Sequence, residues 1–247
     1  MKIRAIILSA LILCGISAVI MYSRAAQPQQ KSSVITQAIN DKNTPMVIKN
    51  LILKMKEQME VNDDQFPELI KEVENYTNSL ADSASVAVLH SMLAEMYQNY
   101  YQRNQWTINQ RTQLSGYIPE DIRVWTSNLF TDKIKEEIDL SLRPTALLQN
   151  TPVSKFKDIL EIGKDSQTLR PTLYEFLAFR ALDIQPTVQI YKDLIAFQNK
   201  EPNMKSVLLT ELDYLRFLYG DKRDKESFEA YMNALDCLLY TSDAADE

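Results

Sequence analysis

Hydrophobic side chains recur along this chain at intervals of three and four residues, the spacing of one face of an α-helix. No stretch alternates polar and apolar residues as a half-buried strand does. The predicted helices cover residues 34–40, 45–60, 66–80, 83–111, 125–142, 154–162, 171–184, 187–198, 203–219 and 225–235. The pattern therefore predicts an all-α fold of antiparallel helix pairs, stacked as a bundle or a solenoid-like array.

Two of these segments carry unusually large side chains. The segment Arg170–Ile184 is apolar or aromatic on almost every side, so we expect its helix to be buried near the centre of the fold. The other segment, Leu89–Trp106, is rich in tyrosine. Its aromatic residues fit two interpretations, a packed core or a groove that stacks against a peptide or a sugar. The candidate groove comprises Tyr97, Tyr100, Tyr101 and Trp106.

Residues 1–26 have the pattern of an export signal, in which a basic start precedes an uncharged, mostly apolar run over residues 5–22. Small residues at the end of this run favour cleavage after Ala25. The run is also long enough to stay in the membrane as an anchoring helix. Lipidation at Cys14 is disfavoured because the preceding Leu13 is not small. We expect an exported chain of the periplasm or cell envelope, which contacts a membrane only through this run if it is uncleaved.

The remaining chain divides by composition into three parts. Residues 27–41 form a polar linker with a short helix, and residues 42–236 form the all-helical domain. Residues 237–247, CLLYTSDAADE, resemble translated adapter sequence, so we expect a non-native tail and a true protein that continues beyond Asp236. A natural acidic tail is the alternative.

The charge of the chain argues against a nucleic-acid partner. The net charge is −6 for the whole chain. Without the signal segment and its three basic residues, 24 basic residues remain against 33 acidic ones, which gives −9. Phosphate binding needs a basic face. The four glycines are scattered, so they cannot form a phosphate-binding loop, and nothing in the sequence indicates a cofactor.

Residues for catalysis or metal binding are scarce. His90 is the single histidine, and we expect it to bond to a neighbouring helix. The adjacent acids Glu136 and Glu137 are expected on a solvated face. Without a second histidine or a cysteine pair, the sequence predicts neither a metal site nor a catalytic residue. A hydrolase that uses two carboxylates stays an alternative, although the sequence selects no particular pair.

The two large-residue segments also carry a resemblance. Leu89-His90-Ser91, Leu93–Tyr97, Tyr100-Tyr101-Gln102 and Trp106 resemble the N-terminal helical region of large bacterial alpha-2-macroglobulin-like proteins, and so do Pro171–Tyr174, Phe176–Ala178 and Arg180–Asp183. Asp121-Ile122 with Trp125 is similar to the family's connection between the two motifs. The resemblance covers about Lys42 to Gly220.

The resemblance implies the helical head of an exported endopeptidase inhibitor, not an enzyme. In this family β-sandwich domains follow the helical part, and many members trap proteases through a thioester in a Gly-Cys-x-Glu-Gln motif. This chain lacks that motif. The expected partners are therefore downstream β-sandwich domains of the same polypeptide, and proteases through them. The alternative is a free-standing envelope scaffold that binds peptide or glycan through the aromatic groove.

Overall fold

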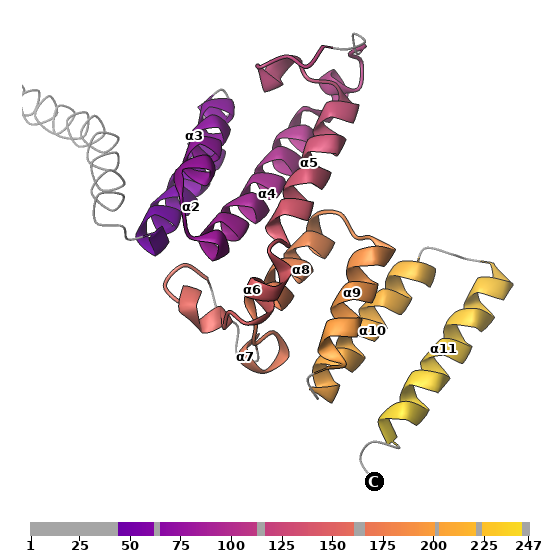
Figure 1. Cartoon of the computed structure of the whole chain (residues 1–247). Coiled ribbons are helices and arrows are strands. Elements are labelled where there is room, and N and C mark those ends of the chain that lie inside the picture. Colours follow the sequence, from indigo (N-terminus) through magenta and orange to yellow (C-terminus); the bar gives the residue numbers. More distant parts are fainter. Residues whose placement is uncertain are drawn as a thin grey trace, which may run out of the picture. The chain divides into compact units, whose positions relative to one another are not determined.

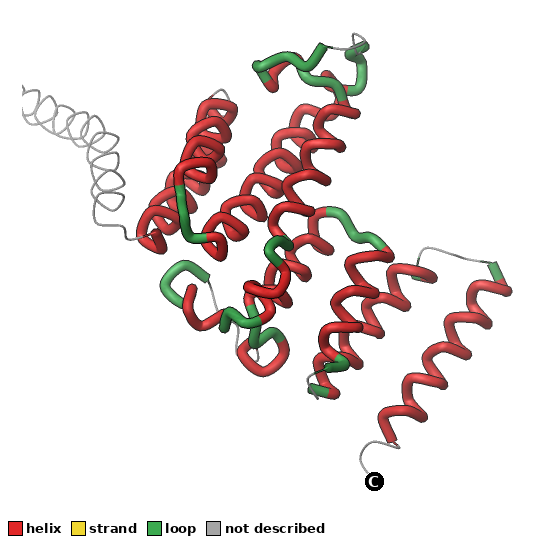
Figure 2. The backbone as a smooth tube through the Cα atoms, in the orientation of Figure 1, coloured by secondary structure: helices red, strands yellow, loops and turns green. Residues whose placement is uncertain are grey.

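The computed structural model describes residues 44–61, 65–112, 117–160, 166–200, 203–220 and 224–243. The regular elements in these ranges are helices (Figure 2), which confirms the all-α class. An isolated antiparallel bridge joins Pro152 and Thr172. The predicted signal segment 1–26 and linker 27–41 lie outside the described residues. No helix in the described ranges has the length and apolar character needed to cross a bilayer.

The first described helix, α2, spans Thr44–Val61 and closely matches the predicted helix over residues 45–60. One stripe of its side chains is buried at helical spacing, namely Val47, Ile48, Leu51 and Met55. The chain divides into two compact units after Glu57, inside this helix. The second unit, from Gln58 onward, holds the remaining helices.

The second unit consists of helices that follow one another along the chain (Figure 1). The longer ones are α3 (Phe66–Ser79), α4 (Ser83–Ile108), α5 (Ser127–Ser141), α8 (Leu173–Ile184), α9 (Val188–Gln198), α10 (Met204–Tyr219) and α11 (Lys225–Asp243). The shorter elements are α6 (Thr145–Gln149), α7 (Ser166–Leu169) and 3-10 turns at Ile122–Val124 and Val153–Phe156. The predicted helices over residues 66–80, 187–198 and 203–219 are confirmed with nearly the same bounds.

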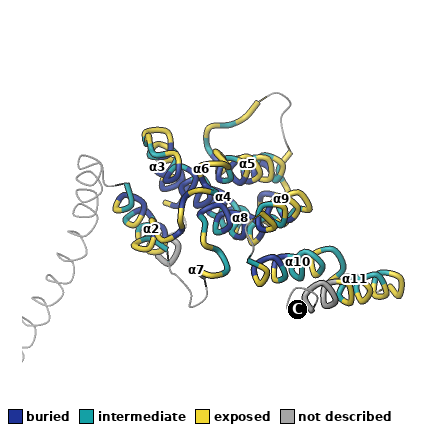
Figure 3. Tube along the Cα trace, turned by 60° about the horizontal axis from the view of Figure 1, so that its bottom comes forward, coloured by how far each residue is buried: buried dark blue, intermediate teal, exposed yellow. Residues whose placement is uncertain are grey.

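Helix α4 is central to the second unit because it packs against α3, α5 and α8. Helix α8 packs in turn on α6 and α9, and α10 packs on both α9 and α11 (Figure 1). Figure 3 shows that buried residues concentrate on α4 and α8, whereas α11 is largely exposed. Since most contacts join helices that are close in sequence, the predicted bundle or array arrangement fits.

An aromatic cluster fills the space between α3, α4 and the start of α5. Tyr97 stacks on Trp125 with ring centroids 5.7 Å apart, and Phe130 lies 5.3 Å from Trp125. The indole nitrogen of Trp125 donates a hydrogen bond to the carbonyl oxygen of Pro119 at 2.6 Å, so the buried ring has its polar atom satisfied. The cluster therefore holds the connection between α4 and α5 against the helices.

Helix α8 is buried on nearly all sides, as its sequence predicts. Its buried side chains include Leu173, Tyr174, Leu177, Ala178, Phe179, Ala181 and Leu182. The helix begins at Leu173 and not at Pro171, because Thr172 is its cap. The Thr172 hydroxyl accepts from the backbone N–H of Glu175, whose carboxylate accepts from the backbone N–H of Thr172. This reciprocal capping box fixes where the helix starts.

Two other predicted boundaries are wrong. Helix α5 begins at Ser127 and not at Trp125, because the N–H of Trp125 closes the preceding 3-10 turn on the carbonyl of Ile122. The predicted helix over residues 154–162 is a 3-10 turn followed by irregular turns as far as Leu160. The backbone at its start is paired elsewhere, since the N–H of Val153 donates to the carbonyl of Pro171 at 2.9 Å.

Helix α11 extends to Asp243, beyond the predicted end at residue 235. It therefore includes part of the segment 237–247. The non-native origin of that segment stays a prediction.

Candidate functional site

The four residues of the predicted groove do not share one surface. Tyr97 is 1% exposed, and its hydroxyl donates to the carboxylate of Glu74 at 2.6 Å. Tyr100 is also buried, because the aromatic cluster covers its ring. Tyr101 is half-buried, whereas Trp106 is 79% exposed. The core interpretation therefore applies to Tyr97 and Tyr100, and the structure does not bring the four together as a groove.

His90 bonds to a neighbouring helix, as predicted. Its Nδ1 lies 2.6 Å from Oε2 of Glu137 on α5. The prediction that Glu137 lies on a solvated face is wrong, because Glu137 is 2% exposed and also pairs with Lys133 at 2.9 Å. Burial alone would raise the pKa of Glu137, but hydrogen bonds from His90 and Lys133 outweigh it and lower that pKa below its ordinary value. The contact between His90 and Glu137 joins α4 to α5, whereas Lys133 and Glu137 are one turn apart on α5.

Arg180 connects the two segments that carry large side chains. Its Nε donates to the hydroxyl of Ser91 at 2.9 Å, and its Nη2 donates to the carboxylate of Glu95 at 2.6 Å. Ser91 and Glu95 are one turn apart on α4, so a single guanidinium on α8 spans both. The polar residues of the two motifs therefore serve the contact between the two helices.

A buried polar network lies where α8, α9 and α10 meet. The side-chain nitrogen of Gln198 donates to Glu175 at 3.2 Å and to the hydroxyl of Ser206 at 2.8 Å. Ser206 donates in turn to the carbonyl of Leu169 at 2.5 Å. Oε1 of Gln198 is buried and has no hydrogen-bond partner among the described residues. The network positions the two helices that follow α8.

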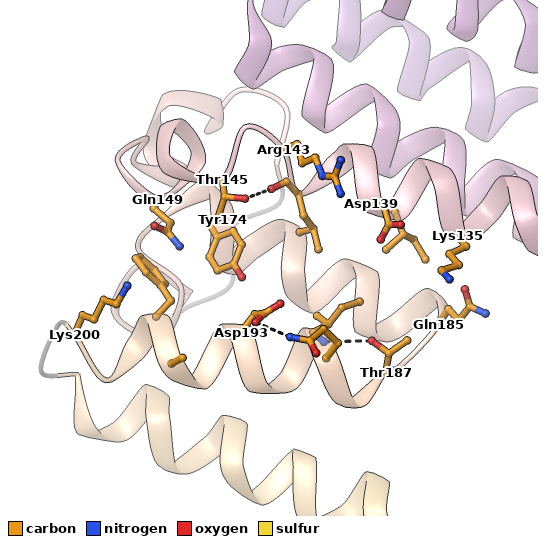
Figure 4. Close-up of a pocket in the computed structure, with 16 residues that line it drawn as sticks. Lys135, Asp139, Arg143, Thr145, Gln149, Tyr174, Gln185, Thr187, Asp193 and Lys200 are labelled. Carbon is orange, nitrogen blue, oxygen red and sulfur yellow. Dashed lines mark hydrogen bonds between the residues drawn. The ribbon is translucent and has the colours of Figure 1, made fainter.

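A cleft of about 900 Å³ lies between α5 and α9 and is bordered by α6 and α8 (Figure 4). Its volume falls within the range of ordinary ligand-binding pockets. Its apolar lining comes from α5 and the residue that follows it, and from α9, namely Ile138, Leu142, Ile190, Ala196 and Phe197. The cleft is the strongest candidate binding site in the described part of the chain.

Tyr174 is the aromatic residue that α8 contributes to this cleft. It is 4% exposed, and its ring packs edge-on against Phe197 with centroids 5.2 Å apart. Figure 4 shows its hydroxyl directed into the cleft. That hydroxyl forms no hydrogen bond with any described residue. Burial, and to a smaller degree the nearby charge of Asp193, raise the pKa of Tyr174 to about 12. The hydroxyl therefore stays protonated and can donate a hydrogen bond.

Charged side chains surround the cleft. Figure 4 shows Lys200 and Gln149 towards one end and Lys135 towards the opposite end, with Arg143 between them on the side of Asp139. None of these three cations forms an ion pair within the described ranges. Of the two acids in the lining, Asp193 accepts a hydrogen bond from Gln189 at 2.8 Å, whereas Asp139 has no such bond. The lining therefore holds three basic and two acidic side chains.

The pattern of apolar and polar residues does not reveal this cleft. Tyr174 is one of many large residues on α8, and its pattern indicates only burial. Gln189 and Asp193 are one turn apart and look like an ordinary solvated face of α9, and Lys200 follows the end of that helix. The cleft depends on how α5 and α9 are placed relative to α8. Helical periodicity within each segment carries no information about this tertiary arrangement.

Comparison of the chain with protein-family profiles, with curated proteins and with solved structures finds no match. In the ranges that the structure describes, no three His, Cys, Asp or Glu side chains gather as a metal site would require.

Proposed function

We propose that this chain is the non-catalytic N-terminal helical module of an exported alpha-2-macroglobulin-like endopeptidase inhibitor. The trap, and any thioester, would lie in β-sandwich domains that follow it, and the protein would act in the periplasm or cell envelope. The observation that carries the proposal is the direct contact between the two segments on which the resemblance rests. Arg180 of the second segment binds Ser91 and Glu95 of the first.

The connection between the two segments takes part in the same packing. Trp125, from the connection, stacks on Tyr97 of the first segment with ring centroids 5.7 Å apart. A guanidinium that reaches two side chains one turn apart, and an indole stacked on a phenol, both require particular residue types at fixed positions. The spacing within the motifs thus has a structural role, which is what a family-specific helical head requires.

The polar groups that could perform chemistry are engaged in structural contacts. His90 and Glu137 bind each other between α4 and α5, and Lys133 completes the cluster. Glu175 belongs to the cap of α8 and to the network around Gln198. These roles support a module that holds or recognises other protein surfaces rather than one that catalyses a reaction.

The exposed side chains of the last helix also support a larger assembly. Phe228 is 60% exposed, and Met232 on the same helix is exposed as well. Large apolar side chains that face water usually mark a surface at which another protein segment packs. A following domain of the same polypeptide would cover them.

The decisive experiment is to sequence the gene downstream of the codon for Leu235 and to purify the protein it encodes from envelope extracts. We expect a frame that continues into β-sandwich domains and a purified protein that inhibits endopeptidases in a cleavage assay. A stop codon within a few residues would end the proposal, as would a full-length protein that fails to slow any of a panel of endopeptidases.

The free-standing scaffold is the second candidate, and the cleft between α5 and α9 favours it. The cleft could hold a ligand without any downstream domain. This candidate would need a ligand site there and not at Tyr97 and Tyr100, whose rings are covered. A stop codon near Leu235 together with ligand binding at the cleft would support it over the inhibitor module.

A further inference from the structure

We propose that a hollow between α9, α10 and α11 binds an organic cation, an ammonium or guanidinium group on an aliphatic stem, through the carboxylate of Glu211. The cation is either a lysine or arginine side chain of a peptide or a free amine of the same chemistry. The larger cleft between α5 and α9 carries side chains of both charges, so its charge selects no class of ligand. The inference does not depend on the inhibitor proposal, because it uses only described residues of α9, α10 and α11.

The hollow has a volume of about 570 Å³, which is within the range of sites for small ligands. It lies along three successive helices, since α10 packs on both α9 and α11. Its apolar lining comes from all three, namely Ile195 and Ala196 on α9, Leu215 on α10 and Ala234 on α11. These side chains suit the aliphatic stem of a lysine, an arginine or an alkylamine, because such a stem is removed from water when it packs against them.

Glu211 is the single acid in this lining. It is half-buried, and its carboxylate forms no hydrogen bond or ion pair with any residue that the structure describes. A carboxylate in this position has lost part of its hydration without gaining a partner. Burial accordingly raises the pKa of Glu211 above its ordinary 4.5. A cation in the hollow would supply the partner that the described part of the protein does not.

Lys192 is the basic residue of the same lining, and it does not compensate Glu211. It is exposed on α9 and forms no ion pair with Glu211. A positive charge close to the carboxylate would lower the pKa of Glu211, whereas burial alone accounts for the direction of the observed shift. An exposed lysine keeps its ammonium group in water. The negative charge of Glu211 is therefore available to a ligand.

Tyr214 and Asn199 add contacts that suit a cation. Tyr214 is three residues after Glu211 on α10, and its ring packs against Tyr191 with centroids 5.1 Å apart. The electron-rich face of an aromatic ring attracts ammonium and guanidinium groups. The side chain of Asn199 forms no hydrogen bond with another described residue, so its carbonyl oxygen can accept from the cation. An anion would be repelled by Glu211, and a neutral ligand would leave its charge uncompensated.

The test measures fluorescence polarisation of a fluorescein-labelled peptide of alanine and lysine with the full chain, at neutral pH and low ionic strength. The comparison peptide replaces each lysine with glutamine, and both peptides have amidated ends. We expect the lysine peptide to bind about tenfold or more tightly. Competition with butylamine separates the two sources of the cation. Displacement by butylamine at the concentration at which unlabelled lysine peptide acts would assign the hollow to a free amine, and much weaker displacement would assign it to a peptide side chain.

Substitutions separate the hollow from general attraction to an acidic protein. Glu211→Gln should weaken the lysine peptide about tenfold. Asp193→Asn removes one negative charge from α9 outside this hollow, so it is the matched control and should leave binding almost unchanged. Tyr214→Leu should weaken binding about threefold. Helical circular dichroism checks that each variant is folded.

The pH dependence of binding gives an independent readout. Glu211 attracts a cation only as the carboxylate, and its pKa lies above 4.5. Affinity should therefore fall as the pH decreases through that pKa, because protonation removes the charge. The other titratable groups of the lining, Lys192 on α9, Tyr214 on α10 and Cys237 on α11, are unchanged in Glu211→Gln. The part of the pH dependence that is lost in this variant therefore belongs to Glu211.

Three outcomes would overturn the proposal. One is equal affinity for the lysine and the glutamine peptide. Another is equal loss of affinity in folded Glu211→Gln and Asp193→Asn proteins, which would show that only the net charge of the protein attracts the peptide. The third is a pH dependence that is the same in Glu211→Gln as in the unsubstituted protein. None of these results would bear on whether downstream inhibitor domains exist, which the gene sequence decides.

Discussion

The interiors of two helix groups differ. The first group consists of α3, α4 and α5, and the second of α8, α9 and α10. In the first group the interior is an aromatic cluster, in which Tyr97 stacks on Trp125 and both contact Phe130. In the second group polar residues are buried, since Gln198 links Glu175 to Ser206. The first interior is closed, and the second borders an open cleft.

The two groups differ in whether their polar side-chain atoms all have hydrogen-bond partners. In the aromatic group the indole nitrogen of Trp125 and the hydroxyl of Tyr97 both have hydrogen-bond partners. In the second group, the hydroxyl of Tyr174 and Oε1 of Gln198 have no hydrogen-bond partner among the residues that the structure describes. Unmade hydrogen bonds cost free energy, so they are retained most readily where a ligand or water can complete them.

Leu177→Asp should have the largest effect, because Leu177 is fully buried in the helix that joins the two groups. An unpaired buried charge costs several kcal/mol, on the order of the whole stability of a domain. We expect loss of the cooperative thermal transition in circular dichroism. Leu209→Asp is the control, because Leu209 is exposed on α10 and should melt almost as the unsubstituted protein does. An unchanged transition in Leu177→Asp would refute the buried position of α8.

The two tryptophans of the chain test the aromatic group directly. Trp125→Ala should lower the free energy of unfolding by about 3–5 kcal/mol, because it removes a stacked, buried ring. Trp106→Ala should change it by less than about 0.5 kcal/mol, because that ring is largely in water. Denaturant titration of each variant supplies both values. Similar losses in the two variants would show that the aromatic cluster does not dominate the stability of α3, α4 and α5.

Glu137→Gln tests the polar contacts at the edge of the aromatic group. At neutral pH it should cost about 1–3 kcal/mol, because charged hydrogen bonds to His90 and Lys133 are lost. The pKa of Glu137 is lowered in the folded state from its ordinary 4.5, so its contribution is complete above pH 4.5 and is lost as pH falls through the folded-state value. The stability gap between the two proteins should therefore narrow on acidification. A gap that is constant between neutral and acidic pH would contradict this assignment.

Thr172→Ala should have the smallest effect of the four, about 1 kcal/mol, because it removes one cap from a helix that is otherwise held by packing. Thr172→Ser keeps the hydroxyl and should recover most of the loss. Chemical denaturation again measures both. Equal losses of unfolding free energy in the two variants would show that the hydroxyl of Thr172 does not stabilise α8. The cap would then not explain why α8 begins at Leu173.

Most helices were predictable because the residue pattern that produces a helix lies within the helix itself. The apolar residues of α3, α9 and α10 recur at helical spacing, and punctuating residues such as Asn203 lie at their starts, so their bounds follow from a short stretch of sequence. The start of α5 did not follow, because Trp125 is recruited to a 3-10 turn and to the aromatic cluster. The prediction of a helix over residues 154–162 was wrong for a similar reason, since the backbone at Val153 pairs with residues before α8.

Side-chain environments were less predictable than helices. Glu137 looks like a solvated acid because it follows another glutamate, yet its burial depends on His90, 47 residues earlier in the chain. Tyr97 and Tyr100 fit both a core and a groove in sequence, and only the position of Trp125 and Phe130 distinguishes the two. The cleft requires the relative placement of α5, α8 and α9, about which helical periodicity carries no information.

The bridge from Arg180 to Ser91 constrains how the chain can be assembled during synthesis. The two residues are 89 positions apart, so at about 5–20 residues per second roughly 4 to 18 seconds pass between their emergence from the ribosome. During that interval the face of α4 that α8 later covers has no native partner. A chaperone that occupies this face, and releases it when α8 arrives, would raise the yield of correctly assembled protein.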